Sequence, residues 1–125
     1  MPKLIYTAMS RHSAFAKELV CAHVFGMGAI PLNPFMMFGY FLYDLADRDL
    51  VRVANARVIS AVDEVWSYGP IANGCLQEIL QAQREGKPIR YFTVATRFQE
   101  ICEIEVDELK FESLDLQESF IASRR

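Results

Sequence analysis

Residues 63–92 read DEVWSYGPIANGCLQEILQAQREGKPIRYF, and this stretch decides the fold. Residues 63–68 are apolar and rich in strand formers, and the Gly-Pro pair that follows ends the strand. Apolar residues then recur at helical spacing, beginning after Asn73 and Gly74 and stopping at Gly86-Lys87-Pro88. Residues 89–94 have the composition of a second, fully buried strand. The stretch therefore predicts a strand–helix–strand unit with parallel strands.

The loop of residues 68–74 is the first candidate for a functional site. In an open parallel sheet, ligands bind beyond the carboxyl ends of the strands, so this loop is expected to face the site. Glu78 lies just over one helical turn past Gly74 and on the same helix face. Its carboxylate can therefore point back at the opening. A lone glutamate on a polar helix face is more often solvated, and spacing alone leaves both interpretations open.

Composition limits the class of protein. The chain has 125 residues, of which 52% are hydrophobic and 23% charged, and its net charge is −3. These values predict one folded domain over residues 1–125. The absence of a basic stripe argues against a nucleic-acid polymer as partner, because such proteins neutralise phosphates with Lys and Arg. A single nucleotide remains compatible with this charge.

The cysteines predict a reducing, cytoplasmic setting. Cys21, Cys75 and Cys102 are odd in number and widely spaced, and nothing resembles a signal peptide. Cys21 and His23 are potential metal ligands, but no second pair would close a site. The sequence therefore predicts neither a metal nor a cofactor.

The remaining segments complete an α/β pattern. Residues 3–8, 29–32 and 101–106 are predicted strands, the last an exposed edge strand. The helix after the first strand is expected to turn Phe15, Leu19, Ala22 and Val24 inward. A helix over residues 44–61 is expected to bury Leu50, Val53, Ala54, Val58 and Ala61 and to expose Arg48, Arg52, Asn55 and Arg57. A short helix is predicted over residues 113–122.

These elements predict one fold class. It is α/β, with a three-layer, flavodoxin-like or Rossmann-like arrangement and an open, mainly parallel sheet of about 4–5 strands with helices on both faces. Residues 4–94 form its predicted core, and residues 95–125 add the edge strand and the terminal helix.

Residues 25–43 carry no charge, so a membrane span must be considered. Prolines and glycines interrupt the run, which favours a buried strand followed by an aromatic loop over residues 35–41. Such a loop caps the core, packs against another subunit or lines a pocket for a flat ligand. No membrane contact is predicted, and a homodimer or higher homo-oligomer is expected.

A family resemblance adds to this interpretation. The runs IYTAMSR, PLNP and DRDL, together with Asp63, Glu64, Trp66, Gly69, Gly74, Glu78 and Gly86-Lys87-Pro88, resemble the nucleoside 2-deoxyribosyltransferase-like family, and most closely its small phage and bacterial members. The resemblance covers residues 4–94. It implies cleavage or transfer of the N-glycosidic bond of a deoxynucleoside or nucleotide, with Glu78 as the counterpart of the nucleophilic glutamate. A second acid is needed to protonate the leaving base, and Asp47 or Asp49 is the nearest candidate.

The resemblance also implies which residues contact the substrate. The turn of Met9, Ser10, Arg11 and His12 is expected at the sugar or 5′-phosphate, with Tyr6 in the site. The segment that begins with Asn33, Pro34 and Phe35 is expected beside the base. Tyr68, Gly69, Asn73 and Gly74 complete the predicted substrate site. Ala72 stands six residues before Glu78, where relatives carry Ser or Asp.

Three functions follow as expectations. The first is an N-glycosidase or deoxyribosyltransferase acting on a small nucleoside or nucleotide. The second is a domain of the same fold that binds or senses a nucleotide without cleaving it. A purely structural subunit is the third.

Overall fold

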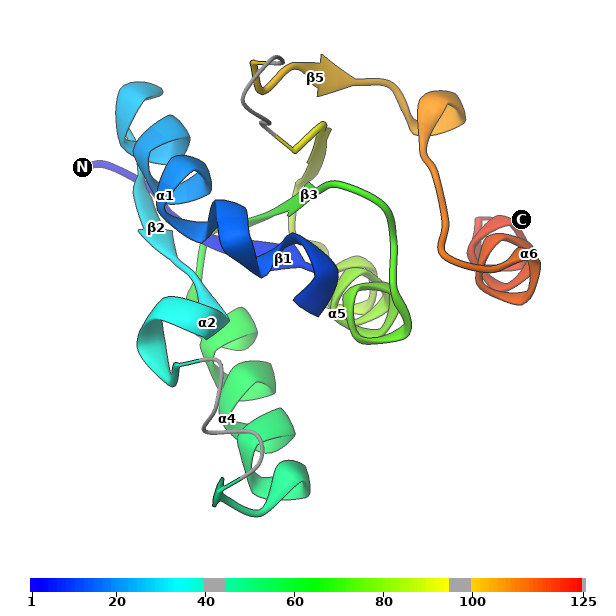
Figure 1. The fold of residues 1–125 in the computed structure, drawn as a ribbon, viewed down its shortest axis with the longest axis horizontal. Coiled ribbons are helices and arrows are strands. Elements are labelled where there is room, and N and C mark those ends of the chain that lie inside the picture. The colour runs from blue at the N-terminus through cyan, green and yellow to red at the C-terminus, as the bar shows by residue number, and fades with distance from the viewer. Residues whose placement is uncertain (40–44, 95–99, 125) are drawn as a thin grey trace.

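Four parallel strands and an antiparallel edge strand form the sheet at the centre of the fold (Figure 1). The computed structural model describes residues 1–39, 45–94 and 100–124. The strand order is β2-β1-β3-β4-β5. The strands are β1 (Leu4–Met9), β2 (Ile30–Leu32), β3 (Glu64–Tyr68), β4 (Ile89–Phe92) and β5 (Glu103–Ile104). The predicted α/β class and mainly parallel open sheet are confirmed.

Helices cover both faces of this sheet. Helix α1 (Lys17–Gly26) follows the short helix η1 (Arg11–Ala16) and packs on one face. Helices α4 (Arg48–Ala61) and α5 (Asn73–Arg84) pack on the other. The remaining helices are α2 (Pro34–Met37), η2 (Val106–Glu108) and α6 (Leu114–Ser123). Both helical layers hold buried clusters against the sheet, as expected for an α/β fold.

The C-terminal segment returns to the loop after β3. Ile71 forms an isolated parallel bridge with Phe111, and the backbone N–H of Glu112 donates to the carbonyl of Ile71 at 2.9 Å. Helix α6 then packs on α5 through Phe120, which is 2% exposed. Figure 1 shows this segment running along one side of the domain to the C-terminus. Residues 110–112 are thereby held at the edge of the predicted site.

Two predicted helix faces were wrong. Phe15 and Leu19 are 69% and 52% exposed, and Ala22 is also exposed. The segment starts as a 3-10 helix, which has fewer residues per turn than an α-helix. The inward face therefore shifts to Ala16, Val20 and Val24. In α4, Leu50 and Val53 are exposed, and the buried residues are Val51, Asn55 and Ile59. The sheet side of α4 thus carries a polar residue where the pattern predicted solvent.

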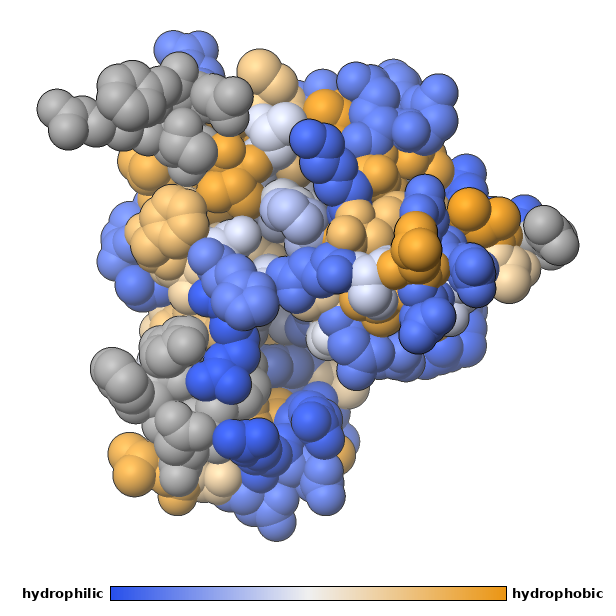
Figure 2. Space-filling view, turned by 45° about the vertical axis from the view of Figure 1, so that its right-hand side comes forward, coloured by the Kyte–Doolittle hydropathy of each residue, from blue (hydrophilic) through white to orange (hydrophobic). Residues whose placement is uncertain are grey.

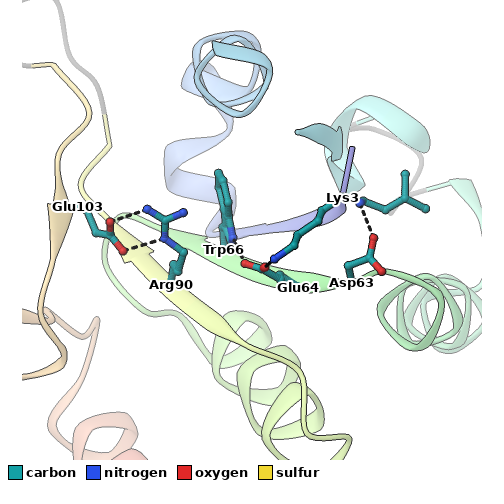
Figure 3. Close-up of polar contacts among 7 residues, drawn as sticks. Lys3, Asp63, Glu64, Trp66, Arg90 and Glu103 are labelled. Carbon is teal, nitrogen blue, oxygen red and sulfur yellow. Dashed lines mark hydrogen bonds and ion pairs between the residues drawn. The ribbon is translucent and has the colours of Figure 1, made fainter. Parts of the chain in front are cut away.

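A polar network fixes the strands at their amino ends, far from the predicted site (Figure 3). Asp63 accepts a hydrogen bond from the backbone N–H of Leu4 at 2.7 Å. Glu64 accepts from Lys3 Nζ at 2.7 Å and from Trp66 Nε1 at 3.0 Å. Burial raises the pKa of Glu64, but these two bonds and the charges of Lys3 and Arg90 together leave that pKa below its usual value. The acidic part of the DEVW motif therefore has a structural role.

The same network ties the edge strand to the sheet. Arg90 on β4 donates to Glu103 on β5 through Nε at 2.8 Å and through Nη2 at 2.6 Å. This bidentate geometry is the strong form of the Arg–carboxylate pair. The guanidinium also lies 4.7 Å from the centre of the Trp66 ring. The edge strand is consequently held by side chains as well as by its short backbone ladder.

Gly69, directly after β3, provides a stability prediction. Its φ is +80°, and a Cβ there would overlap the side chain of Val94. We expect Gly69→Ala to lower the free energy of unfolding by about 2 kcal/mol or more, because left-handed strain adds to overpacking. Urea denaturation measures this loss. Gly86→Ala is the matched control, since Gly86 has a φ of +70° and open space around its Cβ position. Equal losses in both variants would contradict the packing argument.

Candidate functional site

A cavity of about 710 Å³ opens at the carboxyl ends of the strands. In the sheet, β2 lies on one side of β1 and β3 on the other. The direction in which successive strands are added therefore reverses between β1 and β3. Ligands bind at such a switch point in open α/β sheets. The lining residues are Met9, Ser10, Arg11, His12, Pro34, Phe35, Arg48, Arg52, Asn55, Ala56, Ile59, Ala72, Asn73, Gly74, Cys75, Gln77, Glu78, Gln81, Arg84 and Glu112.

Most of the predicted contact residues lie in this lining. The turn after β1, the start of α2 and the start of α5 all contribute, and Glu78 is among the lining residues. The sheet topology brings these segments together because each follows the carboxyl end of a neighbouring strand. The predicted location of the site at this edge of the sheet agrees with the position of the cavity.

Glu78 is half-buried on α5 and accepts a hydrogen bond from the hydroxyl of Tyr6. Tyr6 lies in the middle of β1, is fully buried and faces the α4–α5 side of the sheet. Burial raises the pKa of Glu78 to about 7, and the bond from Tyr6 lowers it in part. A carboxyl group with a pKa near neutrality is typical of functional sites, and its ionised form is the one that can act as a nucleophile.

Glu112 is a second carboxylate in the same cavity. Its Oε2 accepts from Ser10 Oγ at 2.8 Å and lies 3.1 Å from His12 Nδ1. Ser10 Oγ in turn accepts the backbone N–H of His12 at 3.1 Å, which caps η1. The Glu112 side chain is 28% exposed and that of His12 is 85% exposed. The C-terminal segment thus presents an acid–imidazole pair at the end of β1.

Asp47 and Asp49 are outside the cavity, so their placement does not support the predicted acid role. Asp47 Oδ1 accepts the backbone N–H groups of Asp49 and Leu50 at 2.8 and 3.4 Å, which makes it the N-cap of α4. Asp49 pairs with Arg52 at 3.2 Å and has an 89% exposed side chain. Carboxylates at these positions complement the helix dipole. Among the described carboxylates, Glu78 and Glu112 are the two in the cavity lining.

Three further predicted residues have structural partners outside the lining. The hydroxyl of Tyr68 lies 2.8 Å from His23 Nδ1 on the α1 side of the sheet. Asn33 is buried, donates to Thr7 Oγ1 at 2.8 Å and caps α2. Gly69 provides the positive φ after β3. These residues shape the loops that border the cavity. The part of the predicted aromatic loop at residues 40–41 is outside the described residues, as is residue 44, where the long helix was predicted to begin.

Cys75 is a buried thiol in the cavity wall. It is 2% exposed, and burial, followed by the charges of Glu78 and Glu112, raises the pKa of its thiol to about 12. A thiol with this pKa is neutral at pH 7, so it is a poor competitor of Glu78 as nucleophile. Cys75, Glu78 and Glu112 all belong to the lining of this cavity.

Sequence reasoning missed Glu112 and the arginines Arg48, Arg52 and Arg84. Glu112 lies in a polar segment far from Glu78 in sequence, and only the bridge of Ile71 to Phe111 brings it to the cavity. Arg48 and Arg52 are exposed, as predicted, but they also line the cavity together with Asn55 and Ile59 of the same helix. The four-residue spacing of Arg48 and Arg52, which places both on one face of a helix, was the available signal.

The described residues show neither a metal cluster nor a membrane-spanning helix. Residues 1–39, 45–94 and 100–124 contain no group of three or more His, Cys, Asp or Glu side chains arranged to hold a metal ion. Across the same ranges, no helix combines the length and the apolar character that crossing a bilayer demands.

Comparison with known proteins identifies a family. No curated protein matches the sequence of this chain. A family model described as a domain of unknown function (DUF7768) matches residues 6–92, which run from Tyr6 through Glu78 to the end of β4. The match leaves Glu112 outside. Since it covers more than half of the chain, the protein belongs to the DUF7768 family.

Proposed function

We propose that the protein cleaves or transfers the N-glycosidic bond of a (deoxy)nucleoside or nucleoside monophosphate, with Glu78 as the nucleophile. One observation carries the proposal. The half-buried carboxylate of Glu78 accepts a hydrogen bond from the buried Tyr6 and lines a cavity at the switch point of the sheet. Loss of a base from a sugar passes through an oxocarbenium-like state, which a carboxylate stabilises and captures. The resemblance to the nucleoside 2-deoxyribosyltransferase-like family supports the same chemistry.

The proposed reaction has two displacements. An oxygen of the Glu78 carboxylate bonds to the anomeric carbon as the bond from that carbon to the base breaks, and the base keeps the bonding electrons. The Glu112–His12 pair supplies the proton that the departing base takes up. Water, or a second base, then attacks the anomeric carbon and breaks the glycosyl ester, which restores the carboxylate. The pair accepts the proton that the attacking group loses.

The experiment that tests this function is release of free base. Incubation with a panel of deoxynucleosides, ribonucleosides and their monophosphates, followed by chromatography, is expected to give free base from at least one member. In the presence of a second base, a new nucleoside would identify a transferase. Calorimetric binding without any release would contradict the enzyme and support the second candidate.

That second candidate is a nucleotide-binding domain without catalysis. Ala72 favours it, because an alanine six residues before Glu78 offers neither hydroxyl nor carboxylate to a sugar. In such a domain the cavity would retain the nucleotide, and Glu78 would serve as a hydrogen-bond partner only. We place either form of the protein in the cytoplasm, on the basis of three cysteines that are free in the structure.

Removing the Tyr6 hydroxyl is expected to shift the pH dependence of the reaction. Burial raises the pKa of Glu78 to about 7, and the bond from Tyr6 is the opposing cause. In Tyr6→Phe the hydrogen bond is gone and burial still raises the pKa of Glu78, so the carboxyl group ionises at higher pH. The acid limb of the kcat/KM profile for base release should then move above pH 7, with a larger activity loss at pH 6 than at pH 9. An unchanged or lower midpoint would contradict this role.

We also propose a homo-oligomer, as expected from the sequence. Leu45, Leu50 and Val53, at and near the start of α4, and Met36 on α2 are each more than half exposed. Exposed apolar side chains gathered on neighbouring elements are typical of protein–protein contacts. Small-angle scattering is expected to give a multiple of the mass of one chain. The mass of one chain at micromolar concentration would contradict the proposal.

A further inference from the structure

Positive charge is concentrated at the cavity of an otherwise acidic chain. Among the described residues, the lining contains four arginines, Arg11, Arg48, Arg52 and Arg84, and two glutamates. The whole chain has a net charge of −3. Figure 2 shows hydrophilic side chains crowding this face at the height of α4. A cavity with more cationic than anionic groups attracts an anionic ligand.

Three of these arginines are spread along the walls formed by α4 and α5. Arg48 and Arg52 are four residues apart on α4, which separates them by about 6 Å along the helix axis. Arg84 lies six residues beyond Glu78 on α5, about 9 Å along that axis. In Figure 1, α4 runs lengthwise in the view while α5 is seen nearly end-on, so the two helix axes point in different directions. The helices approach each other where Gln81 Nε2 donates to the carbonyl of Ala56 at 2.8 Å. The arginines are therefore spread along the α4–α5 side of the cavity, which we call the α4–α5 arm, rather than gathered at one point.

Arg52 can turn from its present partner to a ligand at low cost. It is paired with Asp49 at 3.2 Å, and the two side chains are 73% and 89% exposed. Such exposed pairs contribute at most about 1 kcal/mol. The planar guanidinium has donors that match two oxygens of a phosphate, and it stays charged at all physiological pH values. Several arginines distributed over an arm of this length match more than one phosphate.

We infer that the arm bordered by Arg48, Arg52 and Arg84 binds a diphosphate group of the ligand. The ligand class is then a phosphorylated nucleoside with its phosphates directed along the α4–α5 arm and its sugar at Glu78. The assignment of the sugar rests on the proposed function, whereas binding of the diphosphate does not. A nucleic-acid polymer is disfavoured because the chain has a net negative charge and its sequence contains no basic stripe.

Calorimetry with four probes tests this site: deoxyadenosine, deoxyadenosine monophosphate, deoxyadenosine diphosphate and inorganic pyrophosphate, at low salt. Glu78→Gln is used throughout to prevent turnover. We expect pyrophosphate to bind, and the diphosphate to bind about 10-fold more tightly than the monophosphate, as one additional charge-assisted contact provides. The double variant Arg48→Gln/Arg52→Gln should weaken both by about 10-fold or more. Arg57→Gln, an exposed arginine of the same helix outside the cavity, should change neither.

Equal affinities for the diphosphate and deoxyadenosine, or an unchanged affinity in the double variant, would overturn the inference. Equal affinities for the monophosphate and the diphosphate would also overturn it, because a single phosphate would then suffice. Circular dichroism confirms that the double variant is folded. If pyrophosphate binds but the wild-type protein releases no base from any substrate, the proposed function fails and the anion site stands. If base is released but binding does not depend on the arginines, the proposed function stands and the anion site fails.

Discussion

Glu78→Gln is expected to reduce base release by at least about 1,000-fold, since losing the nucleophile removes the covalent route altogether. The amide has nearly the shape of the carboxyl group and keeps an acceptor for the Tyr6 hydroxyl, so the cavity should be preserved. Initial rates at pH 8, followed by chromatography of the free base, measure the loss. Glu85→Gln is the matched control, because Glu85 lies at the end of α5 and outside the cavity.

The stability of this variant separates a catalytic loss from unfolding. The pKa of Glu78 is raised to about 7 by burial, while in the unfolded chain the carboxyl group has its ordinary pKa of 4.5. The unfolded state therefore loses its proton first, and wild-type stability falls as pH rises between these values. Gln does not ionise, so the stability of Glu78→Gln relative to wild type should rise over that window. A folded variant with wild-type rates would refute Glu78 as nucleophile.

Glu112→Gln is expected to slow base release by about 100-fold, within the range that general acid–base catalysis contributes. Glu112 lies 3.1 Å from His12 Nδ1 and accepts from Ser10 Oγ at 2.8 Å, so it both orients the imidazole and supplies charge. The loss should depend on the leaving group. The rate on a nucleoside whose base needs protonation should fall by about the full 100-fold. The rate on 4-nitrophenyl 2-deoxyriboside should fall much less, because 4-nitrophenolate leaves without a proton.

This dependence on the leaving group is the control for a merely structural role. If Glu112 only held the β1 turn in place, both substrates would be slowed equally, and Ser10→Ala would have the same effect as Glu112→Gln. His12→Gln should give the same leaving-group pattern as Glu112→Gln, because the two residues form one proton-donating pair. Equal losses on the two substrates would contradict the general-acid role.

The fold was predictable because its determinants are local. The signals are short-range: strand formers before Gly69, helical spacing after Asn73 and a stop at Gly86-Lys87-Pro88. Strand β3, helix α5 and strand β4 lie where these signals indicate. Helix faces were less predictable. The inward face of α1 shifted with a 3-10 start, and α4 buries Asn55 while Leu50 is exposed.

The predicted site residues that line one cavity are those that topology alone brings together. Glu78 and the turn after β1 follow neighbouring strands, and a parallel sheet places both at one edge. Glu112 depends on a contact with Ile71 that spans a large sequence separation, and no local pattern indicates it. Asp47 was predicted as a candidate acid, but an aspartate just before a helix also suits the N-cap position, and the structure shows the cap. Distinguishing such alternatives requires knowing where each helix points.

The stereochemistry of the reaction tests the central claim most directly. A glycosyl ester on Glu78 implies two displacements at the anomeric carbon and therefore retention of configuration, whereas direct attack of water or alcohol implies inversion. Methanol as acceptor gives a methyl glycoside that does not change configuration in water, and proton NMR identifies its anomer. From a β-nucleoside the proposed mechanism predicts the β-methyl deoxyriboside. The α-methyl product would contradict it.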